Sequence, residues 1–358
     1  MKIAFFHELT TLSGARKAVE EYGKILGKEH KIDLYYVDYK EDANASLIFN
    51  KTYYFKFVGS KSRIYRDSVE LIKLFRLHQR IATIMQNEGY DFVFVSPSKF
   101  TQAPFLLRMV KKTVYFCQEP LRIVYDPLFK IPSDLNLFKK LYEKINRLNR
   151  KLIDKSNIGK AGLVLANSEF SKNNIKKAYG INANICYLGV DADRFKPVKS
   201  AKSTDILFIG EKEFVEGFDL LEQTLALYEK KPILKFVTRD ISGAGVSEDN
   251  LIANINKSKI VLALSRNEPF GLIPPEVMAC EVPVIAVDEG GFKESVINGK
   301  TGFLIKPDPK ELKEKIDLLL SGDKLRIEMG ASGRKAVLNK FTWEKSANNF
   351  INIAKTIL

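Results

Sequence analysis

The sequence predicts an α/β protein with two doubly wound domains, and three observations lead to this expectation. Short apolar runs alternate with helix-like patterns along all 358 residues, which is typical of parallel sheets crossed by helices. The length exceeds that of one ordinary core. A polar segment around Pro197 divides the runs into two groups. We therefore expect a first domain at 1–190, a linker at 191–204 and a second domain at 205–341, with a closing helix at 342–358 that packs back on the first domain.

The individual elements follow from hydrophobic periodicity. Six runs predict strands in the first group, at residues 2–6, 31–37, 91–96, 113–117, 162–167 and 184–188. Five runs predict strands in the second group, at residues 205–210, 234–238, 259–265, 283–287 and 301–305. Helical patterns cover 15–26, 68–85 and 137–158 and begin near Gly217, Asp249, Gly271, Pro309 and Lys324.

The positive charge is concentrated at one end of the chain. The formal net charge is +14, and residues 1–190 hold 32 Lys and Arg against 18 Asp and Glu, whereas the remainder holds 25 of each. A domain so basic should be drawn to polyanions. The stretch 50–80 places Tyr53, Tyr54, Phe55 and Phe57 among lysines and arginines, which suits an interfacial docking surface. A solvated basic helix after an ordinary strand explains the same pattern equally well.

Several classes of protein are disfavoured by what the sequence contains. A nucleic-acid-binding protein would rest on charge alone, because no reading motif is present, and we expect no such partner. The first residues resemble a strand rather than a signal peptide, and no run approaches the length of a membrane span. Cys117, Cys186 and Cys280 lack the spacing of a metal site or a disulfide framework. We therefore expect a cytoplasmic protein with reduced thiols that lies peripherally at the membrane.

The stretch beginning SRNEPFG carries the most specific chemistry. Glu268 and Glu276 are separated by seven residues, which predicts Glu268 in a loop after a strand and Glu276 about two turns into the next helix. Carboxylates accept hydrogen bonds from sugar and ribose hydroxyls, and the N–H groups of Phe270, Gly271 and Leu272 at a helix start can bind phosphate. This combination predicts a nucleotide-sugar site. The plainer alternative is a first-turn helix acid and a solvated glutamate.

This stretch resembles the signature of the retaining GT-B glycosyltransferases of family 4. LSGARKAVEEYGKIL from Leu12, LVLANSEFSKNNIKKAYG from Leu163, YLGVDADRFKP from Tyr187 and the tail from Phe341 are similar to further segments of that family. VYFCQEPLRIVYD from Val114 is most similar to members that build polysaccharides and glycolipids, often mannosyltransferases. The resemblance covers nearly the whole chain. It implies two Rossmann-like domains facing a central cleft that holds the donor.

The resemblance also implies roles for single residues. Glu268 would contact the transferred sugar and Glu276 the nucleotide ribose, while Gly14 would let the first loop approach the donor phosphates. Gln118 stands where the matching members carry a His that positions the donor sugar. The position of His7 at the end of the first strand suggests contact with the acceptor or the donor. A purely structural role explains this position equally well. Retaining members are thought to let the leaving phosphate oxygen take the acceptor proton, so no metal and no cofactor is expected.

The chain departs from the family where cations are expected. Glu211 and Glu216 occupy positions where the family usually has an Arg and a Lys that neutralise the donor diphosphate. Three outcomes are open. Lys212, Arg239 or Arg266 substitutes from nearby, the donor is held differently, or transfer is weak or lost. The chain is also shorter than the family's usual length before the strand predicted at 259–265.

Together these features predict a metal-independent hexosyltransferase. It would move a sugar from a GDP- or UDP-linked donor to a lipid-linked or membrane-proximal glycan at the cytoplasmic face of a membrane. The alternative is a GT-B binding or partner subunit with weak or lost transfer, because function resides in the site rather than in the fold. The Asp191-Ala192-Asp193 triplet matches a metal-chelating pattern of another glycosyltransferase fold, but its position between the domains argues against a metal role.

Overall fold

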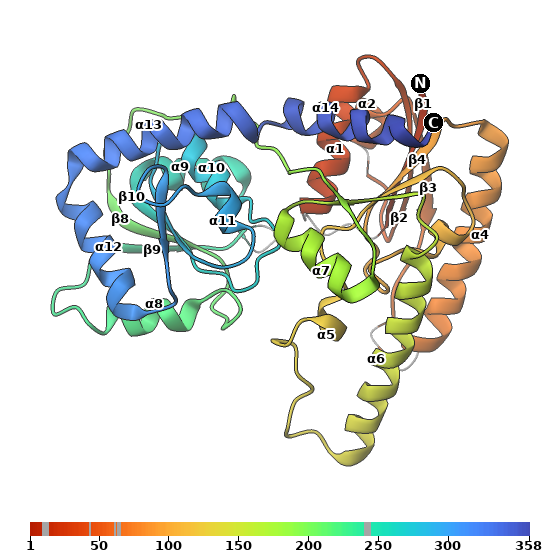
Figure 1. Ribbon diagram of the computed structural model, residues 1–358, viewed down its shortest axis with the longest axis horizontal. Coiled ribbons are helices and arrows are strands. Elements are labelled where there is room, and N and C mark those ends of the chain that lie inside the picture. The colour runs from red at the N-terminus through yellow and green to blue at the C-terminus, as the bar shows by residue number, and fades with distance from the viewer. Residues whose placement is uncertain (9–13, 43, 61, 63–65, 240–244) are drawn as a thin grey trace. The chain divides into compact units, whose positions relative to one another are not determined.

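The computed structural model describes residues 1–8, 14–42, 44–60, 62, 66–239 and 245–358. The chain forms two compact units (Figure 1). Unit 1 comprises residues 1–186 and 347–358, and unit 2 comprises residues 187–346. Each unit is built on one parallel sheet with helices against it, so the predicted doubly wound α/β class is confirmed.

The sheet of unit 1 has seven parallel strands in the order β3-β2-β1-β4-β5-β6-β7. Their bounds are β1 Lys2–Glu8, β2 Lys31–Asp38, β3 Lys51–Lys56, β4 Phe92–Val95, β5 Thr113–Phe116, β6 Leu163–Ala166 and β7 Asn184–Ile185. The chain runs outward from β1 to β3 and then returns to place β4 on the other side of β1. Ligands of open α/β sheets bind at the carboxyl ends of the strands beside such a switch in direction.

Helices cover both faces of this sheet, which is why its strands are continuous apolar runs. The helical segments of unit 1 are α1 Gly14–Leu26, α2 Ala45–Ile48, η1 Arg66–Glu70, α4 Leu71–Glu88, η2 Phe105–Arg108, α5 Arg122–Tyr125, α6 Leu137–Ile158, α7 Glu169–Tyr179, the end of α14 Trp343–Ala354, and η3 Lys355–Ile357. Phe6 packs toward Leu74 on the α4 face. Phe5, one residue earlier, faces the opposite side and contacts Phe350 of α14.

The aromatic residues near β3 belong to the core. The rings of Tyr53 and Tyr35 stack with centroids 4.3 Å apart, and Phe55 and Phe57 are each only 8% exposed. The interfacial docking surface predicted for this stretch is therefore wrong for these side chains, because β3 pairs with β2 and turns them onto the sheet. Lys61 and Arg63, the most basic part of the prediction, lie outside the described residues.

The sheet of unit 2 has five parallel strands in the order β12-β11-β10-β8-β9. Their bounds are β8 Thr204–Ile209, β9 Leu234–Val237, β10 Ser258–Ala263, β11 Val284–Val287 and β12 Gly302–Ile305. The helices are α8 Phe218–Leu225, α9 Glu248–Lys257, α10 Ile273–Ala279, α11 Phe292–Ser295, α12 Pro309–Ser321 and α13 Asp323–Lys340. The order in which successive strands are added reverses between β8 and β10, as it does between β1 and β4 in unit 1. We call each of these two places a strand switch.

The segment 191–204, predicted as a linker, is a fixed part of unit 2. The backbone N–H of Val198 donates to Oδ1 of Asn256 over 2.8 Å, and Nδ2 of Asn256 donates back to the carbonyl of Lys196 over 3.2 Å. These bonds tie the segment to the end of α9. The division between the units consequently falls before Tyr187 rather than at 191.

The last helix returns to unit 1 through one buried aromatic side chain. The ring of Phe350 stacks on Tyr22 of α1 with centroids 4.9 Å apart and meets Phe94 of β4 edge-on at 5.1 Å. Phe350 has no exposed surface. Residues from Ala347 onward thus complete the core of unit 1.

We predict that Phe350→Ala lowers the free energy of unfolding of unit 1 by about 3–5 kcal/mol, because it removes a fully buried aromatic ring. Urea denaturation followed by fluorescence measures this loss. The exposed neighbour Asn352→Ala provides the control on the same helix. Equal midpoints for the two variants would show that the returning helix does not stabilise unit 1.

Candidate functional site

The predicted donor residues of unit 2 gather at the carboxyl ends of its central strands. Arg239 follows β9, and the loop containing Glu268 follows β10. That loop leads directly into α10, which carries Glu276. All three therefore lie at the edge formed by the carboxyl ends of the strands, close to β8 and β10, whose following connections run to opposite sides. Nucleotide ligands bind at this position in folds of this type.

Close packing against a glycine turn holds the Glu268 loop in place. The N–H of Gly291 donates to the carbonyl of Glu268 over 2.9 Å. Gly290 has φ +57°, and a Cβ atom there would stand 2.4 Å from that same carbonyl. At Gly271, φ is +78° and a Cβ would stand 2.2 Å from the Phe292 ring. The loop requires glycine at both positions. The sequence signal for this support was the Gly-Gly pair at the end of the motif.

Glu276 lies in the first turn of α10, not two turns into the helix as predicted. The helix begins at Ile273, and Pro274 and Pro275 are its next two residues. Proline lacks an N–H and fits the first turn of a helix but not its interior. The two prolines thus place the start of the helix later than expected and bring Glu276, 1% exposed, close to the loop.

The backbone before α10 retains donors in the described part of the chain. No hydrogen bond among the described residues uses the N–H of Phe270 or Gly271. The Phe270 ring itself is buried against Tyr187 and Phe341. Leu272 immediately precedes the helix. The predicted role of these three residues in phosphate binding therefore rests on their backbone alone and stays a prediction.

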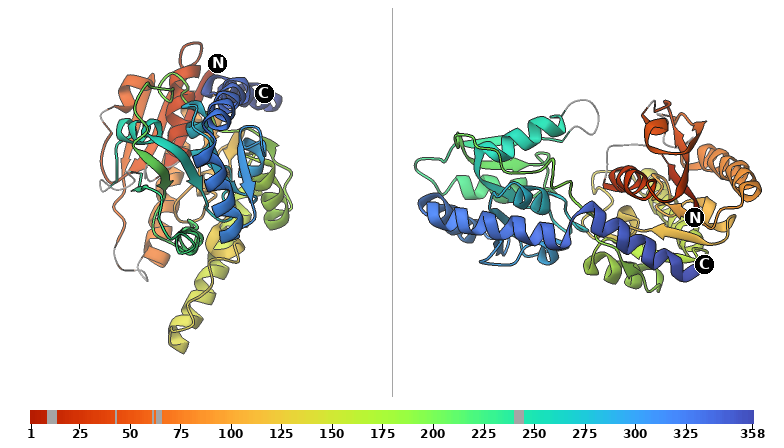
Figure 2. Two further views of the ribbon diagram at one scale, coloured as in Figure 1. Left: turned by 90° about the vertical axis from the view of Figure 1, so that its left-hand side faces the viewer. Right: turned by 90° about the horizontal axis from the view of Figure 1, so that it is seen from above.

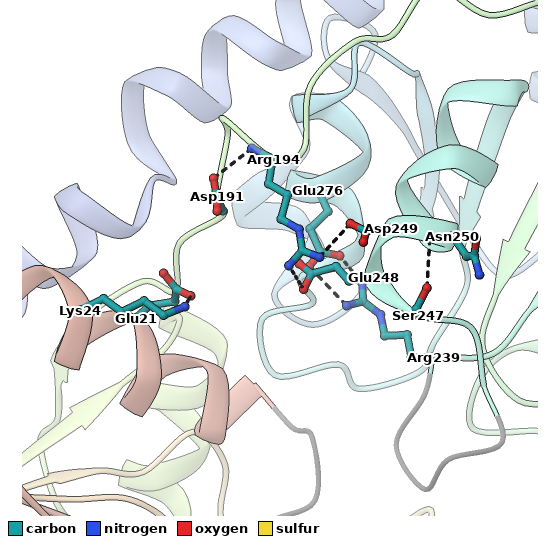
Figure 3. A network of polar contacts seen from close by, with 10 residues as sticks. All are labelled: Glu21, Lys24, Asp191, Arg194, Arg239, Ser247, Glu248, Asp249, Asn250 and Glu276. Carbon is teal, nitrogen blue, oxygen red and sulfur yellow. Dashed lines mark hydrogen bonds and ion pairs between the residues drawn. The ribbon is translucent and has the colours of Figure 1, made fainter. Parts of the chain in front are cut away.

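An ion pair links Arg239, whose side chain is 31% exposed, to the buried carboxylate of Glu276 (Figure 3). Nη1 of Arg239 donates to Oε1 of Glu276 over 3.2 Å, and Nη2 donates to Oε2. Burial lowers the pKa of Arg239, but the carboxylates of Glu276, Glu248 and Glu268 outweigh this and raise the pKa. Arg239 is therefore a permanent cation facing both glutamates of the motif.

The other two candidate cations serve the loop after β8. Arg266 forms a bidentate pair with Asp219 at 2.7 and 2.8 Å and lies 3.8 Å over the Phe214 ring. Nζ of Lys212 lies 5.1 Å from the centre of the Phe236 ring. Within the described ranges neither cation contacts Glu268 or Glu276. Of the three replacements proposed from the sequence, the structure brings only Arg239 to the motif.

Glu216 places a negative charge beside the strand switch. Oγ of Ser265, which follows β10, donates to Oε2 of Glu216 over 2.8 Å. A Cβ at Gly210 would stand 3.0 Å from this same oxygen, so the carboxylate lies against the end of β8. Glu211, its neighbour in the loop, is exposed. An anionic donor would meet repulsion here that basic residues would not cause.

Unit 1 has a corresponding pair at its own strand switch. Nδ1 of His7 on β1 lies 2.6 Å from Oγ of Ser96, which follows β4. Nε2 of His7 is buried without a hydrogen-bond partner among the described residues. Burial, and secondly the charge of Arg16, lower the pKa of His7 to about 3. The imidazole is thus neutral and keeps one ring nitrogen for a further partner.

Gln118 follows β5 at the same edge of this sheet. Its backbone carbonyl accepts a hydrogen bond from Oγ of Ser171 over 2.7 Å. Its side-chain Nε2 is buried without a partner in the described part of the chain. Gly14 is the first residue of α1. The loop before it, residues 9–13, lies outside the described residues. The predicted roles of Gln118 and Gly14 accordingly stay predictions.

Sequence reasoning missed a buried polar group next to His7. Oγ of Ser98 donates to Oε1 of Glu8 over 2.6 Å, and Nε2 of His78 on α4 lies 3.2 Å from Oε2 of Glu8. Glu8 and His78 are both almost fully buried. Their signal in the sequence was a charged residue ending an apolar strand and a histidine on the apolar face of a helix.

The predicted absence of a metal is not decided by these contacts. Among the described residues no three His, Cys, Asp or Glu side chains converge as metal ligands. Oδ1 of Asp191 accepts from the N–H groups of Asp193 and Arg194 at 3.1 and 3.0 Å, which is the geometry of a turn. The three cysteines are buried and form no disulfide in the described part of the chain. No helix in the described ranges is long and apolar enough to cross a bilayer.

Comparison with known proteins agrees with this architecture. Residues 240–336 match the family model "Glycosyl transferases group 1". The chain is 36% identical over 178 residues to the uncharacterized glycosyltransferase MJ1178 of Methanocaldococcus jannaschii, covering 46% of this chain and 49% of that protein. It is 26% identical over 289 residues to human alpha-1,3/1,6-mannosyltransferase ALG2, covering 67% and 66%. The similarity thus spans less than two thirds of either relative.

A solved structure extends the likeness to the whole chain. Anabaena Alr3699/HepE in complex with UDP-glucose superposes with a TM-score of 0.71 over 99% of this chain and 100% of that one, at 16% identity. Fold and strand order define a GT-B protein. Residues 240–336, which lie within unit 2, are thus a glycosyl transferases group 1 domain.

The low pKa of His7 predicts a specific pH dependence of stability. The unfolded chain binds a proton near the ordinary value of 6.5, whereas folded His7 does so only near 3, so stability falls as the pH drops through this interval. Between pH 6.5 and about 4.5 the loss from this residue is about 2 kcal/mol. Urea titrations should show that His7→Gln loses correspondingly less than the wild type. The same substitution at His30 is the comparison, and an unchanged pH dependence in His7→Gln would contradict the assignment.

Proposed function

We propose that the protein is a retaining, metal-independent hexosyltransferase. It uses a nucleotide-diphosphate sugar as donor and a lipid-linked or membrane-proximal glycan as acceptor at the cytoplasmic face of a membrane. One observation carries the proposal, namely that Arg239 pairs with Glu276 at the strand switch of unit 2 (Figure 3) and lies near enough for the charge of Glu268 to act on it as well. A carboxylate for the sugar, a carboxylate for the ribose and a cation for the diphosphate are the groups that such a donor requires.

The ion pair leaves both partners able to bind the donor. Each oxygen of a carboxylate can accept more than one hydrogen bond, so the pair with Arg239 does not by itself prevent Glu276 from accepting from ribose hydroxyls. Guanidinium carries five N–H groups, of which the pair uses two. The remaining N–H groups of Arg239 suit phosphate oxygens, together with the backbone N–H groups of Phe270 and Gly271. In this way Arg239 supplies the positive charge that Glu211 and Glu216 do not.

The chemistry asked of the side chains is modest. The bond between the anomeric carbon and the phosphate oxygen breaks, and the acceptor hydroxyl forms its bond on the same face of the sugar. The departing phosphate oxygen takes the hydroxyl proton. The protein then acts chiefly by positioning the two substrates and stabilising the charge of the leaving diphosphate. Within unit 2, Glu268 orients the sugar.

Relatives guide the choice of substrates. The human relative is named as a mannosyltransferase, and the structural relative was solved with UDP-glucose. Both names support a hexose donor and leave GDP and UDP as the two candidates. The membrane-proximal acceptor is supported by unit 1, which holds 33 Lys and Arg against 18 Asp and Glu and is therefore attracted to anionic surfaces.

A second function is favoured by the acidic loop after β8. Glu216 holds its charge beside the strand switch through the bond from Ser265, and Gln118 replaces a histidine of the matching family members. A GT-B subunit that binds a partner without transferring sugar would tolerate both features. Donor binding separates the two functions, because the partner subunit has no need of a nucleotide.

Titration calorimetry with UDP, GDP and their hexose conjugates, in the presence of a chelator, tests the donor site. We expect micromolar binding of one nucleotide and at least tenfold weaker binding to Glu276→Gln, which loses the charge paired with Arg239. Glu314→Gln, an exposed glutamate of α12, is the control. If none of these ligands binds to the wild type, the partner-subunit function takes precedence.

Restoring the expected cations provides a gain-of-function test. The double variant Glu211→Arg/Glu216→Lys should bind the preferred nucleoside diphosphate at least tenfold more tightly, which corresponds to about 1.4 kcal/mol. Glu229→Lys makes a similar change of charge at an exposed position of unit 2 and should have little effect. Unchanged or weaker binding by the double variant would mean that the diphosphate does not lie beside the ends of β8 and β10.

A further inference from the structure

Helix α6 of unit 1 has its polar side buried and its apolar side exposed. The buried residues of its middle and end are Glu143, Asn146, Asp154, Asn157 and Ile158. Six large apolar side chains are exposed instead, namely Leu137, Phe138, Leu141, Ile145, Leu148 and Leu152. A surface helix normally shows the opposite arrangement. We name these six residues the α6 stripe.

Specific hydrogen bonds fix this orientation of the helix. Nδ2 of Asn146 donates to Oδ2 of Asp67 over 2.7 Å. Asp154 accepts from the N–H of Ala103 at 2.9 Å and from the hydroxyl of Tyr179 at 2.6 Å. Rotating α6 to bury its stripe would leave these polar groups without their partners, at a cost greater than the gain from a single apolar contact. The stripe therefore faces away from unit 1 by construction.

The stripe is continuous along the helix. Five of its residues follow one another at intervals of three or four, from Phe138 to Leu152, so they form one row about 21 Å long. Exposure ranges from 52% at Ile145 to 84% at Phe138. The first turns of α6 extend beyond the other elements of unit 1 in two views (Figures 1 and 2). None of the described residues of unit 1 covers the row.

The charges beside the stripe decide what can cover it. Lys139, Lys144, Lys151 and Lys155 are exposed on α6, while its two acidic residues, Glu143 and Asp154, are buried. A second copy of the helix placed on the stripe would bring two rows of lysines together. An anionic lipid surface instead matches apolar side chains at its boundary and lysines at its headgroups.

We propose that α6 docks the protein on anionic membranes, with the α6 stripe inserted at the headgroup boundary and the flanking lysines on the lipid phosphates. This assigns the docking role to residues 137–155 rather than to the stretch 50–80 expected from the sequence. The docking proposal rests on the proposed function in one respect only, namely that docking brings a membrane-proximal acceptor within reach of the protein.

Sedimentation with vesicles of phosphatidylcholine containing 30% phosphatidylglycerol tests the proposal without any substrate. The wild type should bind these vesicles at least tenfold better than vesicles of phosphatidylcholine alone. Leu141→Asp/Leu148→Asp should lose at least tenfold in binding. Leu47→Asp/Ile327→Asp, at two exposed apolar residues elsewhere, is the matched control and should bind as the wild type does.

A second pair of changes tests the charged part of the surface. Lys144→Glu/Lys155→Glu should lower binding to the anionic vesicles at least tenfold and remove the preference over neutral ones. Because all these side chains are exposed, the variants should keep the melting temperature of the wild type. They should also keep its nucleotide affinity, so failure of docking and failure of the donor site are observed separately.

Three results would overturn the proposal. The first is wild-type protein that does not sediment with anionic vesicles. The second is a Leu141→Asp/Leu148→Asp variant that binds as well as the control pair. The third, measured by light scattering, is a wild-type dimer that this variant dissociates, which would assign the stripe to a second copy of the chain.

Discussion

The ion pair between Arg239 and the buried carboxylate of Glu276 is the interaction on which the proposed donor site depends. Glu276 is almost completely buried, and burying a carboxylate costs free energy unless a cation and hydrogen bonds compensate for the lost water. Arg239 does this from the end of β9, while Glu248 at the start of α9 and Glu268 in the next loop add further negative charge around the same guanidinium. Removing Arg239 would leave the buried carboxylate of Glu276 without its cation, at a cost of about 3–5 kcal/mol. The pair thus joins the segment after β9 to helix α10.

The two units use the same topology with different polar chemistry. In each sheet the order of the strands reverses beside the first strand. At each of these places a serine that follows one central strand forms a hydrogen bond with a residue at the end of the other. In unit 1 Ser96 meets neutral His7, whereas in unit 2 Ser265 meets anionic Glu216. A neutral site suits the hydroxyl groups of a glycan. The negative one makes Arg239 and the backbone N–H groups before α10 the sources of attraction for a diphosphate.

Hydrophobic periodicity predicted most of the fold because strands buried on both faces and amphipathic helices have distinct patterns. β3 was predicted only as the alternative to an interfacial segment, because its aromatic residues lie among lysines. The helical pattern of α6 was predicted to the residue, yet periodicity reports that a helix has two faces and not which one is buried. That choice is made by Asn146 and Asp154, whose partners are distant in sequence. The same limit applies to the ion pair, because nothing local connects Arg239 with Glu276.

The central claim is that Arg239 replaces the missing cations while still paired with Glu276. A crystal structure with the preferred nucleoside diphosphate tests it most directly. The account predicts the ribose hydroxyls on Glu276, the diphosphate over the N–H groups of Phe270 and Gly271, and a guanidinium N–H of Arg239 on a phosphate oxygen. A diphosphate bound away from Arg239, or one held by Lys212 or Arg266 while the Arg239–Glu276 pair excludes it, would contradict the account.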